Sequence, residues 1–163
     1  MITFRYRTDQ ADIENVRRIV SSSSFFNADE IEIAVELAAD NFEKKEKSDY
    51  KFIFADEGDF TSGYSCFGHI GGTESSYDLY WIAVDESLRG NGIGKKLLEE
   101  TVSAVSKIGG GRIYAETSSK DQYDPTRRFY LSNGFYQEAF IENFYAPGDG
   151  KLIYTRIVAG INA

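Results

Sequence analysis

The spacing of apolar positions along the chain changes repeatedly between the period of a strand and that of a helix. A two-residue alternation at 2–7 predicts a strand, and apolar positions three or four residues apart predict helices at 10–20 and from Asn27 or Asp29 onward. The pattern then predicts strands at 51–55, 63–70 and 77–84, a helix at 93–108, a strand at 112–117, a helix at 125–132, and strands at 135–144 and 151–158. This order predicts a single α/β domain over residues 1–163, with a mixed central sheet flanked by helices.

Several residues mark where these elements begin and end. We expect Asp9 or Asp12 to cap the first helix, and Pro125 to lie in the first turn of the last helix. Asn133-Gly134 has the form of a helix C-cap, and residues 145–150 are expected to connect the last two strands. The helix at 93–108 is expected to direct these apolar side chains inward: Ile93, Leu97, Leu98, Val102, Val105 and Ile108.

A glycine-rich turn separates the strand at 77–84 from the helix that follows it. The turn reads Arg-x-x-Gly-x-Gly, from Arg89 through Gly92 to Gly94. Such a turn exposes backbone N–H groups at a helix N-terminus, where the helix dipole adds partial positive charge. Glycine also permits positive φ and the close approach of a ligand. The turn is therefore suited to bind a phosphate or a pyrophosphate.

Three phosphate-binding motifs compete for this turn. A Walker loop fails because Arg89 replaces its first glycine, and because Lys96 follows Lys95 where Ser or Thr is needed. A dinucleotide fingerprint that starts at Gly90 fails because its third glycine falls on Lys95. The pattern fits the pyrophosphate loop of acetyl-CoA-dependent acyltransferases, and a turn that binds no ligand is the alternative.

Two stretches of the chain resemble the GNAT superfamily of N-acetyltransferases. Residues 80–98, YWIAVDESLRGNGIGKKLL, resemble its motif A, and residues 126–135, TRRFYLSNGF, resemble its later helix-turn-strand segment. The resemblance implies a mostly antiparallel mixed sheet with splayed middle strands, and acetyl-CoA as co-substrate. It assigns cofactor contacts to Ile82, Ala83, Val84, Arg89, Gly90, Asn91, Gly92, Ile93, Gly94, Lys95, Tyr123 and Tyr130.

Tyr123 departs from the family pattern, which commonly has an Asn seven residues before the tyrosine at Tyr130. The ring or hydroxyl of Tyr123 could replace the contact that this Asn makes with the cofactor arm, or the contact could be lost. The substitution affects how the arm is held and leaves the family resemblance intact.

Two side chains are the main candidates for proton transfer. By the resemblance, Tyr130 aligns with the tyrosine that often protonates the departing CoA thiolate, and a phenol with a pKa of about 10 keeps its proton at neutral pH. Glu116 lies at the end of the 112–117 strand, where a carboxylate could accept the ammonium proton directly or through water, could simply bind the ammonium, or could be an ordinary carboxylate at the rim. Less favoured candidates for the base are Asp78, Glu30, Glu32 and His69.

The expected acceptor is a primary amine of a small molecule, with a peptide or protein amine as an alternative. Aromatic rings and carboxylates suit an ammonium group through cation–π attraction and ion pairing, although ordinary loop packing would explain the same residues. A non-catalytic module that binds acyl-CoA for sensing is a different class, and a nucleotide-phosphate binder is a third. The expected acceptor contacts are Phe25, Phe26, Glu30, Tyr80, Glu116 and Tyr145.

Composition narrows the remaining possibilities. The 163 residues carry a net charge of −8, which disfavours a nucleic-acid partner because such binding needs a basic face. No stretch is apolar for long enough to span a membrane, and the His, Cys and carboxylate spacing predicts no metal site. A single cysteine, Cys66, excludes an intramolecular disulfide and favours the cytoplasm. We expect a monomer or a homodimer.

Overall fold

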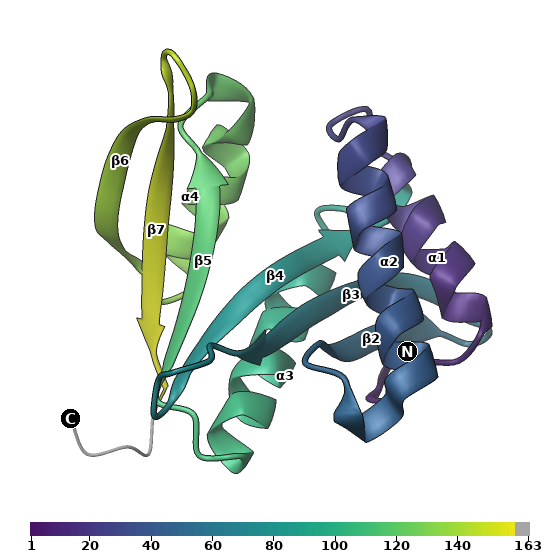
Figure 1. Cartoon of the computed structure of the whole chain (residues 1–163). Helices are drawn as coiled ribbons and strands as arrows, with labels where there is room; N and C mark the ends of the chain where they lie inside the picture. Colours follow the sequence, from purple (N-terminus) through teal and green to yellow (C-terminus); the bar gives the residue numbers. More distant parts are fainter. Residues whose placement is uncertain (159–163) are drawn as a thin grey trace. The chain divides into compact units, whose positions relative to one another are not determined.

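The strands and helices follow one another in the predicted order (Figure 1). The computed structural model describes residues 1–158. Its strands form one seven-stranded sheet in the order β1-β2-β3-β4-β5-β7-β6. The elements are β1 (Ile2–Arg5), α1 (Ala11–Ser21), α2 (Ala28–Lys44), η1 (Lys45–Lys47), β2 (Lys51–Glu57), β3 (Phe60–His69), β4 (Ser76–Val84), η2 (Glu86–Leu88), α3 (Ile93–Lys107), β5 (Arg112–Ser118), η3 (Asp121–Tyr123), α4 (Asp124–Ser132), β6 (Tyr136–Ala146) and β7 (Asp149–Ile157).

The sheet is mixed, as predicted. The pairs β1–β2, β2–β3, β5–β7 and β6–β7 are antiparallel, whereas β4 and β5 are parallel. The register of β4 with β5 joins Ser76 to Arg112, Tyr77 to Ile113 and Asp78 to Tyr114. The splay of these two strands beyond that register stays a prediction.

The described chain divides into two compact units, and each is described by itself. The first unit contains residues 1–68 and 79–104, and the second contains residues 69–78 and the chain from 105 onward. Strand β4 contributes residues to both units. The assignment of residues 1–163 to one domain stays a prediction.

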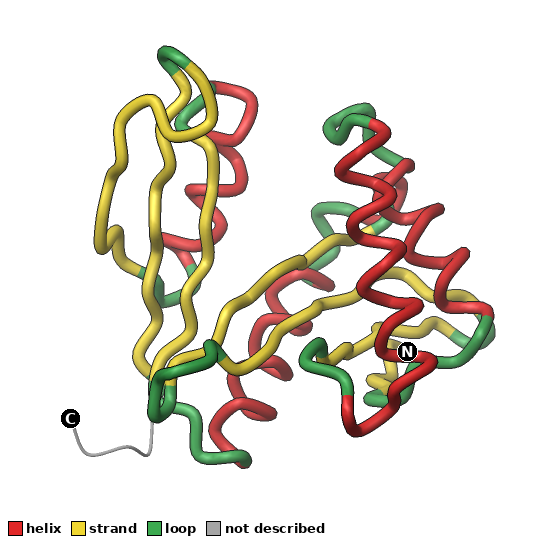
Figure 2. The backbone as a smooth tube through the Cα atoms, in the orientation of Figure 1, coloured by secondary structure: helices red, strands yellow, loops and turns green. Residues whose placement is uncertain are grey.

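In the first unit, α1 and α2 cover one face of the sheet formed by β2 and β3, and α3 lies on its other face (Figure 2). The helical period places apolar residues of α1 and α2 against this sheet, where burial of apolar surface stabilises the fold. Helix α2 begins at Ala28, as the sequence predicted, and a capping box precedes it: the Asn27 side chain accepts from the Glu30 N–H, and Glu30 accepts from the Asn27 N–H. The central residues of this core are Val16, Ile19, Ala34, Ala38, Phe52, Phe54 and Tyr64.

Strand β3 approaches β4 and α3 closely at a glycine. A Cβ on Gly63 would lie 2.7 Å from the carbonyl oxygen of Ala83 and 3.2 Å from Cδ1 of Leu97, which is fully buried. No side chain fits there without a shift of the β4 backbone. The close approach therefore fixes the position of β4 just before the glycine-rich turn.

In the second unit, α4 packs against one face of the sheet formed by β5 and β7 (Figure 1). The ring of Tyr130 lies 5.1 Å from that of Phe135 and 5.9 Å from that of Tyr154, and all three side chains are buried. Pro125 lies in the first turn of α4, and Gly134 follows the C-cap Asn133 with a φ of 83°. Both predictions about the ends of this helix are confirmed.

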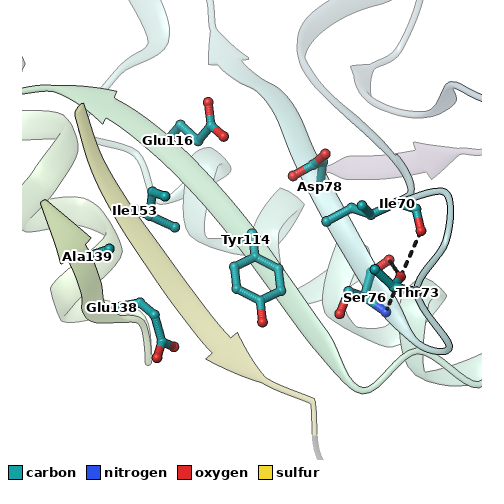
Figure 3. Close-up of a pocket in the computed structure, with 9 residues that line it drawn as sticks. All are labelled: Ile70, Thr73, Ser76, Asp78, Tyr114, Glu116, Glu138, Ala139 and Ile153. Atoms are coloured by element: carbon teal, nitrogen blue, oxygen red, sulfur yellow. Dashed lines mark hydrogen bonds between the residues drawn. The ribbon is translucent and has the colours of Figure 1, made fainter. Parts of the chain in front are cut away.

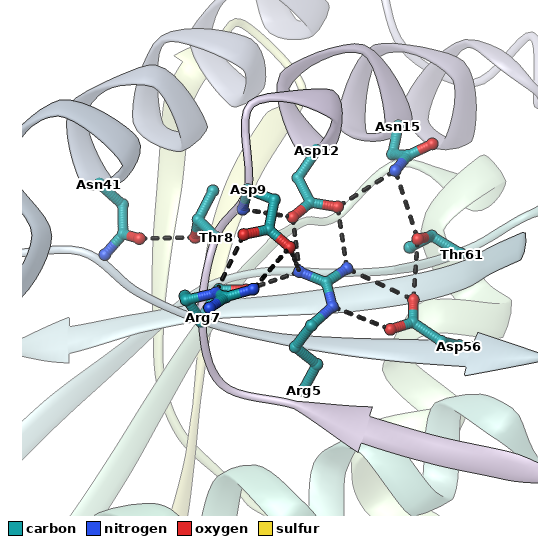
Figure 4. A network of polar contacts seen from close by, with 9 residues as sticks. All are labelled: Arg5, Arg7, Thr8, Asp9, Asp12, Asn15, Asn41, Asp56 and Thr61. Atoms are coloured by element: carbon teal, nitrogen blue, oxygen red, sulfur yellow. Dashed lines mark hydrogen bonds and ion pairs between the residues drawn. The ribbon is translucent and has the colours of Figure 1, made fainter. Parts of the chain in front are cut away.

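A polar network replaces the predicted cap of α1 (Figure 4). The N-cap residue is Gln10, so the prediction of Asp9 or Asp12 in this role was wrong. The buried Asp12 carboxylate instead accepts from Nη1 of Arg5 at 2.6 Å, and Nε of Arg5 donates to Asp56 at 3.0 Å. One guanidinium thus joins β1, α1 and β2, which compensates the cost of burying Asp12.

Two further predictions about the chain were wrong. Ile108 is 58% exposed, because α3 ends at Lys107 and Ile108 lies in the turn that follows it. The connection predicted at 145–150 is much shorter, because β6 extends to Ala146 and β7 begins at Asp149. Gly148, with a φ of 80°, makes this tight turn possible.

Gly63→Ala is expected to lower the free energy of unfolding by about 1 to 3 kcal/mol, because its methyl group would overlap the Ala83 carbonyl. Gly71→Ala is the matched control, since a Cβ at Gly71 meets nothing within 4 Å. Urea denaturation followed by the fluorescence of Trp81 measures both variants. Equal stability of the two variants would contradict the close approach of β3 to β4.

Candidate active site

The turn between β4 and α3 has the backbone geometry that the sequence predicted. Gly90 and Gly92 adopt φ values of 81° and 78°, and a Cβ on either would meet nothing within 4 Å. The Lys96 N–H donates to the carbonyl oxygen of Gly92. The N–H groups of residues 93–95 come before this bond and have no acceptor within the helix. The turn therefore presents open space beside N–H groups at the positive end of a helix dipole.

Asp85 holds the start of this turn. Its buried carboxylate accepts from the Ser87 hydroxyl at 2.7 Å, from the Ser87 N–H at 3.1 Å and from Nη1 of Arg18 at 2.5 Å. Nη2 of Arg18 donates to the Thr61 carbonyl oxygen at 2.6 Å, which links the turn to β3. Hydrogen bonds from Ser87, followed by the charge of Arg18, lower the pKa of Asp85 despite its burial. Asp85 therefore stays ionised near neutral pH.

Positive charge surrounds the turn on the outside. Arg89, Lys95 and Lys96 are exposed, and Nε of Arg89 donates to the Val84 carbonyl oxygen at 3.4 Å. Nδ2 of Asn91 donates to the Leu88 carbonyl oxygen at 3.2 Å, so this side chain stabilises the turn itself. Free N–H groups, glycines with open space and nearby cations together fit the pyrophosphate of acetyl-CoA.

The acceptor residues predicted in the first unit are engaged in local packing. The ring of Phe26 lies 5.7 Å from that of Phe25 and 5.0 Å from that of Trp81. The Tyr80 ring is 39% exposed and lies 5.3 Å from that of Tyr50. The carboxylate of Glu30 belongs to the capping box of α2. Their contact with an acceptor stays a prediction, and Glu30 has a structural role in any case.

Tyr130, the predicted acid, and Tyr123, which stands where the family commonly has an Asn, both lie in the second unit. The Tyr130 hydroxyl group belongs to a buried side chain, and burial raises its pKa well above the usual range. The phenol is therefore neutral at physiological pH and can donate a proton. Tyr123 ends η3 just before α4, and its side chain is half-buried. A role of Tyr123 toward the cofactor arm stays a prediction.

The predicted base, Glu116, has a partner that sequence reasoning missed. Nζ of Lys151 lies 2.8 Å from Oε2 of Glu116 and 4.1 Å from the centre of the Phe144 ring. The Tyr145 ring contacts that of Phe144 at 5.0 Å. The sequence predicted that a carboxylate and aromatic rings would bind the ammonium group of a substrate. In the structure, Glu116 and Phe144 contact the ammonium group of Lys151 instead. Only the pairing of β5 with β7 brings Lys151 near Glu116, and the sequence gives no local signal for it.

A pocket of about 420 Å³ lies beside this ion pair within the second unit (Figure 3). Asp78, another candidate base, lines it and is half-buried. Burial, and then the negative charge of Glu116, raise the pKa of Asp78. The sequence analysis did not predict Tyr114 and Glu138 as lining residues. The full lining is Ile70, Thr73, Ser76, Asp78, Tyr114, Glu116, Glu138, Ala139 and Ile153.

Comparison with known proteins identifies the family. A family profile described as an acetyltransferase (GNAT) domain matches residues 48–137, which is more than half of the chain. The chain belongs to the GNAT family of acetyltransferases. A crystal structure of a protein assigned to this family as an acetyltransferase, from Desulfovibrio desulfuricans, is 42% identical with a TM-score of 0.96. The match covers 98% of this chain and 100% of that one.

More distant structures share the fold of this GNAT protein. The ribosomal-protein-S18-alanine N-acetyltransferase from Escherichia coli is 17% identical with a TM-score of 0.78, and the match covers 99% of this chain and 97% of that one. An aminoglycoside 6'-N-acetyltransferase in complex with coenzyme A is 15% identical with a TM-score of 0.77, and the match covers 100% and 99%. A search of curated proteins found no match. The family and the fold assign this chain to the acetyl-CoA-dependent N-acetyltransferases.

Residues 1–158 contain no group of three or more His, Cys, Asp or Glu side chains placed to hold a metal ion. No helix in this part of the chain combines the length and the apolar character that a membrane crossing requires.

Asp85→Asn is expected to lower the free energy of unfolding by about 1 to 3 kcal/mol at neutral pH and to weaken CoA binding, because it removes the charge that holds the turn to Arg18. The pKa of Asp85 is lowered in the folded state, so its contribution is present above the unfolded pKa of about 3.9 and is lost as the pH falls through the lower folded value. Thermal denaturation across this pH range, together with calorimetric titration of CoA, measures both effects.

Glu86→Gln provides the control for Asp85→Asn, because Glu86 is the exposed neighbour of Asp85 on the same turn. It is expected to unfold like the wild type at every pH. A stability difference for Asp85→Asn that stays constant from neutral to strongly acidic pH would contradict the ionic role of Asp85.

Proposed function

We propose that this protein transfers an acetyl group from acetyl-CoA to a primary amine of a small molecule, by direct attack within a ternary complex. The single observation that best supports the use of acetyl-CoA is the open turn at residues 89–95, with positive φ at Gly90 and Gly92. We place the reaction in the cytoplasm, because the only cysteine, Cys66, is a buried free thiol and no disulfide is formed.

The turn and β4 bind different parts of the cofactor. The N–H groups of residues 93–95 hold the pyrophosphate, and Arg89 and Lys95 add positive charge at its rim. By family resemblance, the backbone of residues 82–84 pairs with the pantetheine arm as an added strand would. A backbone N–H in this stretch donates to the thioester oxygen and stabilises the negative charge that develops there.

The reaction itself needs two proton transfers. The neutral amine nitrogen attacks the thioester carbonyl carbon, a C–N bond forms, and the C–S bond then breaks with its electron pair on sulfur. Tyr130 donates its phenolic proton to the departing thiolate, a role supported by the burial that keeps the phenol neutral. The proton that the amine nitrogen loses passes to a carboxylate or to water, and a proton from water returns to the Tyr130 phenolate. The amine and acetyl-CoA thus give the amide and the CoA thiol with no net change in protons.

Glu116 is the carboxylate that we propose for the acceptor amine. Its side chain is 47% exposed and therefore reaches water, although Lys151 already neutralises part of its charge. Its contribution as a base is thus expected to run through a water molecule. Asp78 lines the same pocket and supplies negative charge for a cationic acceptor.

Acetyl-CoA and CoA are expected to raise the melting temperature, whereas ATP at the same concentration leaves it unchanged. A ligand at about 100 times its dissociation constant adds about 2.7 kcal/mol, which corresponds to a rise of about 5 to 10 °C for a chain of this size. Differential scanning fluorimetry measures the shift, and detection of free thiol with a panel of amines measures turnover. Stabilisation by ATP alone would show that the turn binds nucleotides, and binding of acetyl-CoA without turnover would favour a sensing module.

Tyr130→Phe is expected to lower kcat by about a hundredfold or more with little change in the KM for acetyl-CoA, because it removes only the proton donor. Its ring packing against Phe135 and Tyr154 is retained, so the fold should be kept. Tyr6→Phe is the control, because Tyr6 is exposed and its hydroxyl group contacts the surface carboxylate of Glu100 in the first unit. Steady-state kinetics of both variants decide the role: a kcat equal to that of the control would remove Tyr130 from the mechanism.

A further inference from the structure

The pocket in the second unit lies on the face of the sheet opposite α4. Tyr154 contacts Tyr130 of α4 and pairs with Ala115, so Ala115 and Tyr154 face the helix. Because side chains alternate along a strand, their neighbours Tyr114, Glu116, Ile153 and Thr155 face the other way. The first three of these residues line the pocket. The pocket is thus separate from the buried core beneath α4.

Negative charge at one end of the pocket is not fully compensated. Lys151 forms an ion pair with Glu116. Among the described residues, no basic side chain forms a salt bridge with Asp78. Asp78 is half-buried and lies in the field of Glu116. Both effects disfavour its ionised form, and the charge of Lys151 offsets them only in part. A cation beside Asp78 would relieve this repulsion. One end of the pocket therefore favours an ammonium group.

A third carboxylate lies at the other end. The register runs across the sheet from Asp78 to Tyr114, then to Thr155, and then to Tyr136 on β6. Three strand spacings separate β4 from β6, which is about 14 Å. The register of β6 with β7 shifts between Gln137 and Ala139, and the residue in this bulge is Glu138, which lines the pocket. A bulge redirects a side chain, and Figure 3 shows Tyr114 between Asp78 and Glu138.

A buried hydroxyl group lies at this second end. Thr155 is buried on the pocket face of β7 and is paired in register with Tyr136 of β6. Hydrogen bonds, first from the Tyr136 hydroxyl group and then from the Thr155 hydroxyl group, lower the pKa of Glu138. Glu138 is therefore ionised at neutral pH and supplies negative charge at this end of the pocket.

The space between the two charged ends is largely apolar. Ile153 and Ala139 are paired on β7 and β6, and the ring of Tyr114 lies beside them (Figure 3). A hydrocarbon chain gains free energy by contact with such a surface, whereas a polyhydroxylated substrate would lose hydrogen bonds with water. The pocket is thus acidic at both ends and apolar between them.

We propose that this pocket binds a linear aliphatic amine with two ammonium groups, one beside Asp78 and Glu116 and the other beside Glu138, and that this diamine is the acetyl acceptor. The inference rests on the proposed function and names its substrate class. The nitrogen near Asp78 is the one acetylated, because Asp78 is on β4, the strand that the family resemblance assigns to the cofactor arm. The Glu138 end selects the length of the acceptor.

The test compares diamines with monoamines of matched carbon chain. Cadaverine is compared with pentylamine, and putrescine with butylamine, by kcat/KM at constant ionic strength. At least one diamine is expected to exceed its matched monoamine by about tenfold, since a charge-assisted contact contributes about 1.5 kcal/mol or more. In Glu138→Gln this ratio is expected to fall toward one, whereas Glu142→Gln, on an exposed position of the same strand, retains it.

Calorimetric titration of the same diamines into the protein with CoA gives a readout that does not depend on turnover. Binding that weakens in Asp78→Asn and in Glu138→Gln, but not in Glu142→Gln, supports the pocket. Equal kcat/KM for diamines and monoamines would overturn the inference while acetyl transfer stands. Diamine binding through Glu138 without release of CoA thiol from any amine would instead overturn the proposed reaction and leave the binding site.

Discussion

The turn between β4 and α3 is the constraint on which the rest of the site depends. It must end a buried strand, begin a helix and leave the first N–H groups of that helix open, which two glycines with φ near 80° accomplish. Neither end of the turn is free to move. Gly63 brings β3 against the Ala83 carbonyl oxygen, and Asp85 ties the chain to Arg18. The anion site that we propose is therefore a product of backbone geometry, and the surrounding core keeps that geometry in place.

The second unit contributes chemistry of a different kind. Its buried aromatic cluster keeps Tyr130 neutral, while the opposite face of its sheet gathers Asp78, Glu116 and Glu138. Lys151 compensates only part of this charge. A carboxylate pocket with incomplete compensation costs stability, and such a cost is typical of sites that bind a ligand of the opposite charge. The first unit thus contributes the turn that we propose for the anionic cofactor, and the second unit contributes the pocket that we propose for a cationic acceptor.

Features encoded by neighbouring residues could be predicted from the sequence, and features made by distant residues could not. The start of α2 after Asn27, the turn at Gly90 and Gly92, and the C-cap at Asn133 are local, and each prediction was confirmed. The partner of Asp12 is Arg5 on β1, and the partner of Glu116 is Lys151 on β7. These contacts depend on strand order and register, as does the bulge that places Glu138 in the pocket. The apolar pattern of one segment does not specify them.

Amide NMR of ¹⁵N-labelled protein during a titration with CoA shows most directly whether the turn binds the pyrophosphate. We expect the largest shifts at the N–H groups of residues 89–95, and we expect desulfo-CoA, which retains the pyrophosphate, to produce the same shifts at these residues. If CoA binds while these amides keep their positions and shifts appear elsewhere, the turn is not the pyrophosphate site, and the protein holds its co-substrate by other groups.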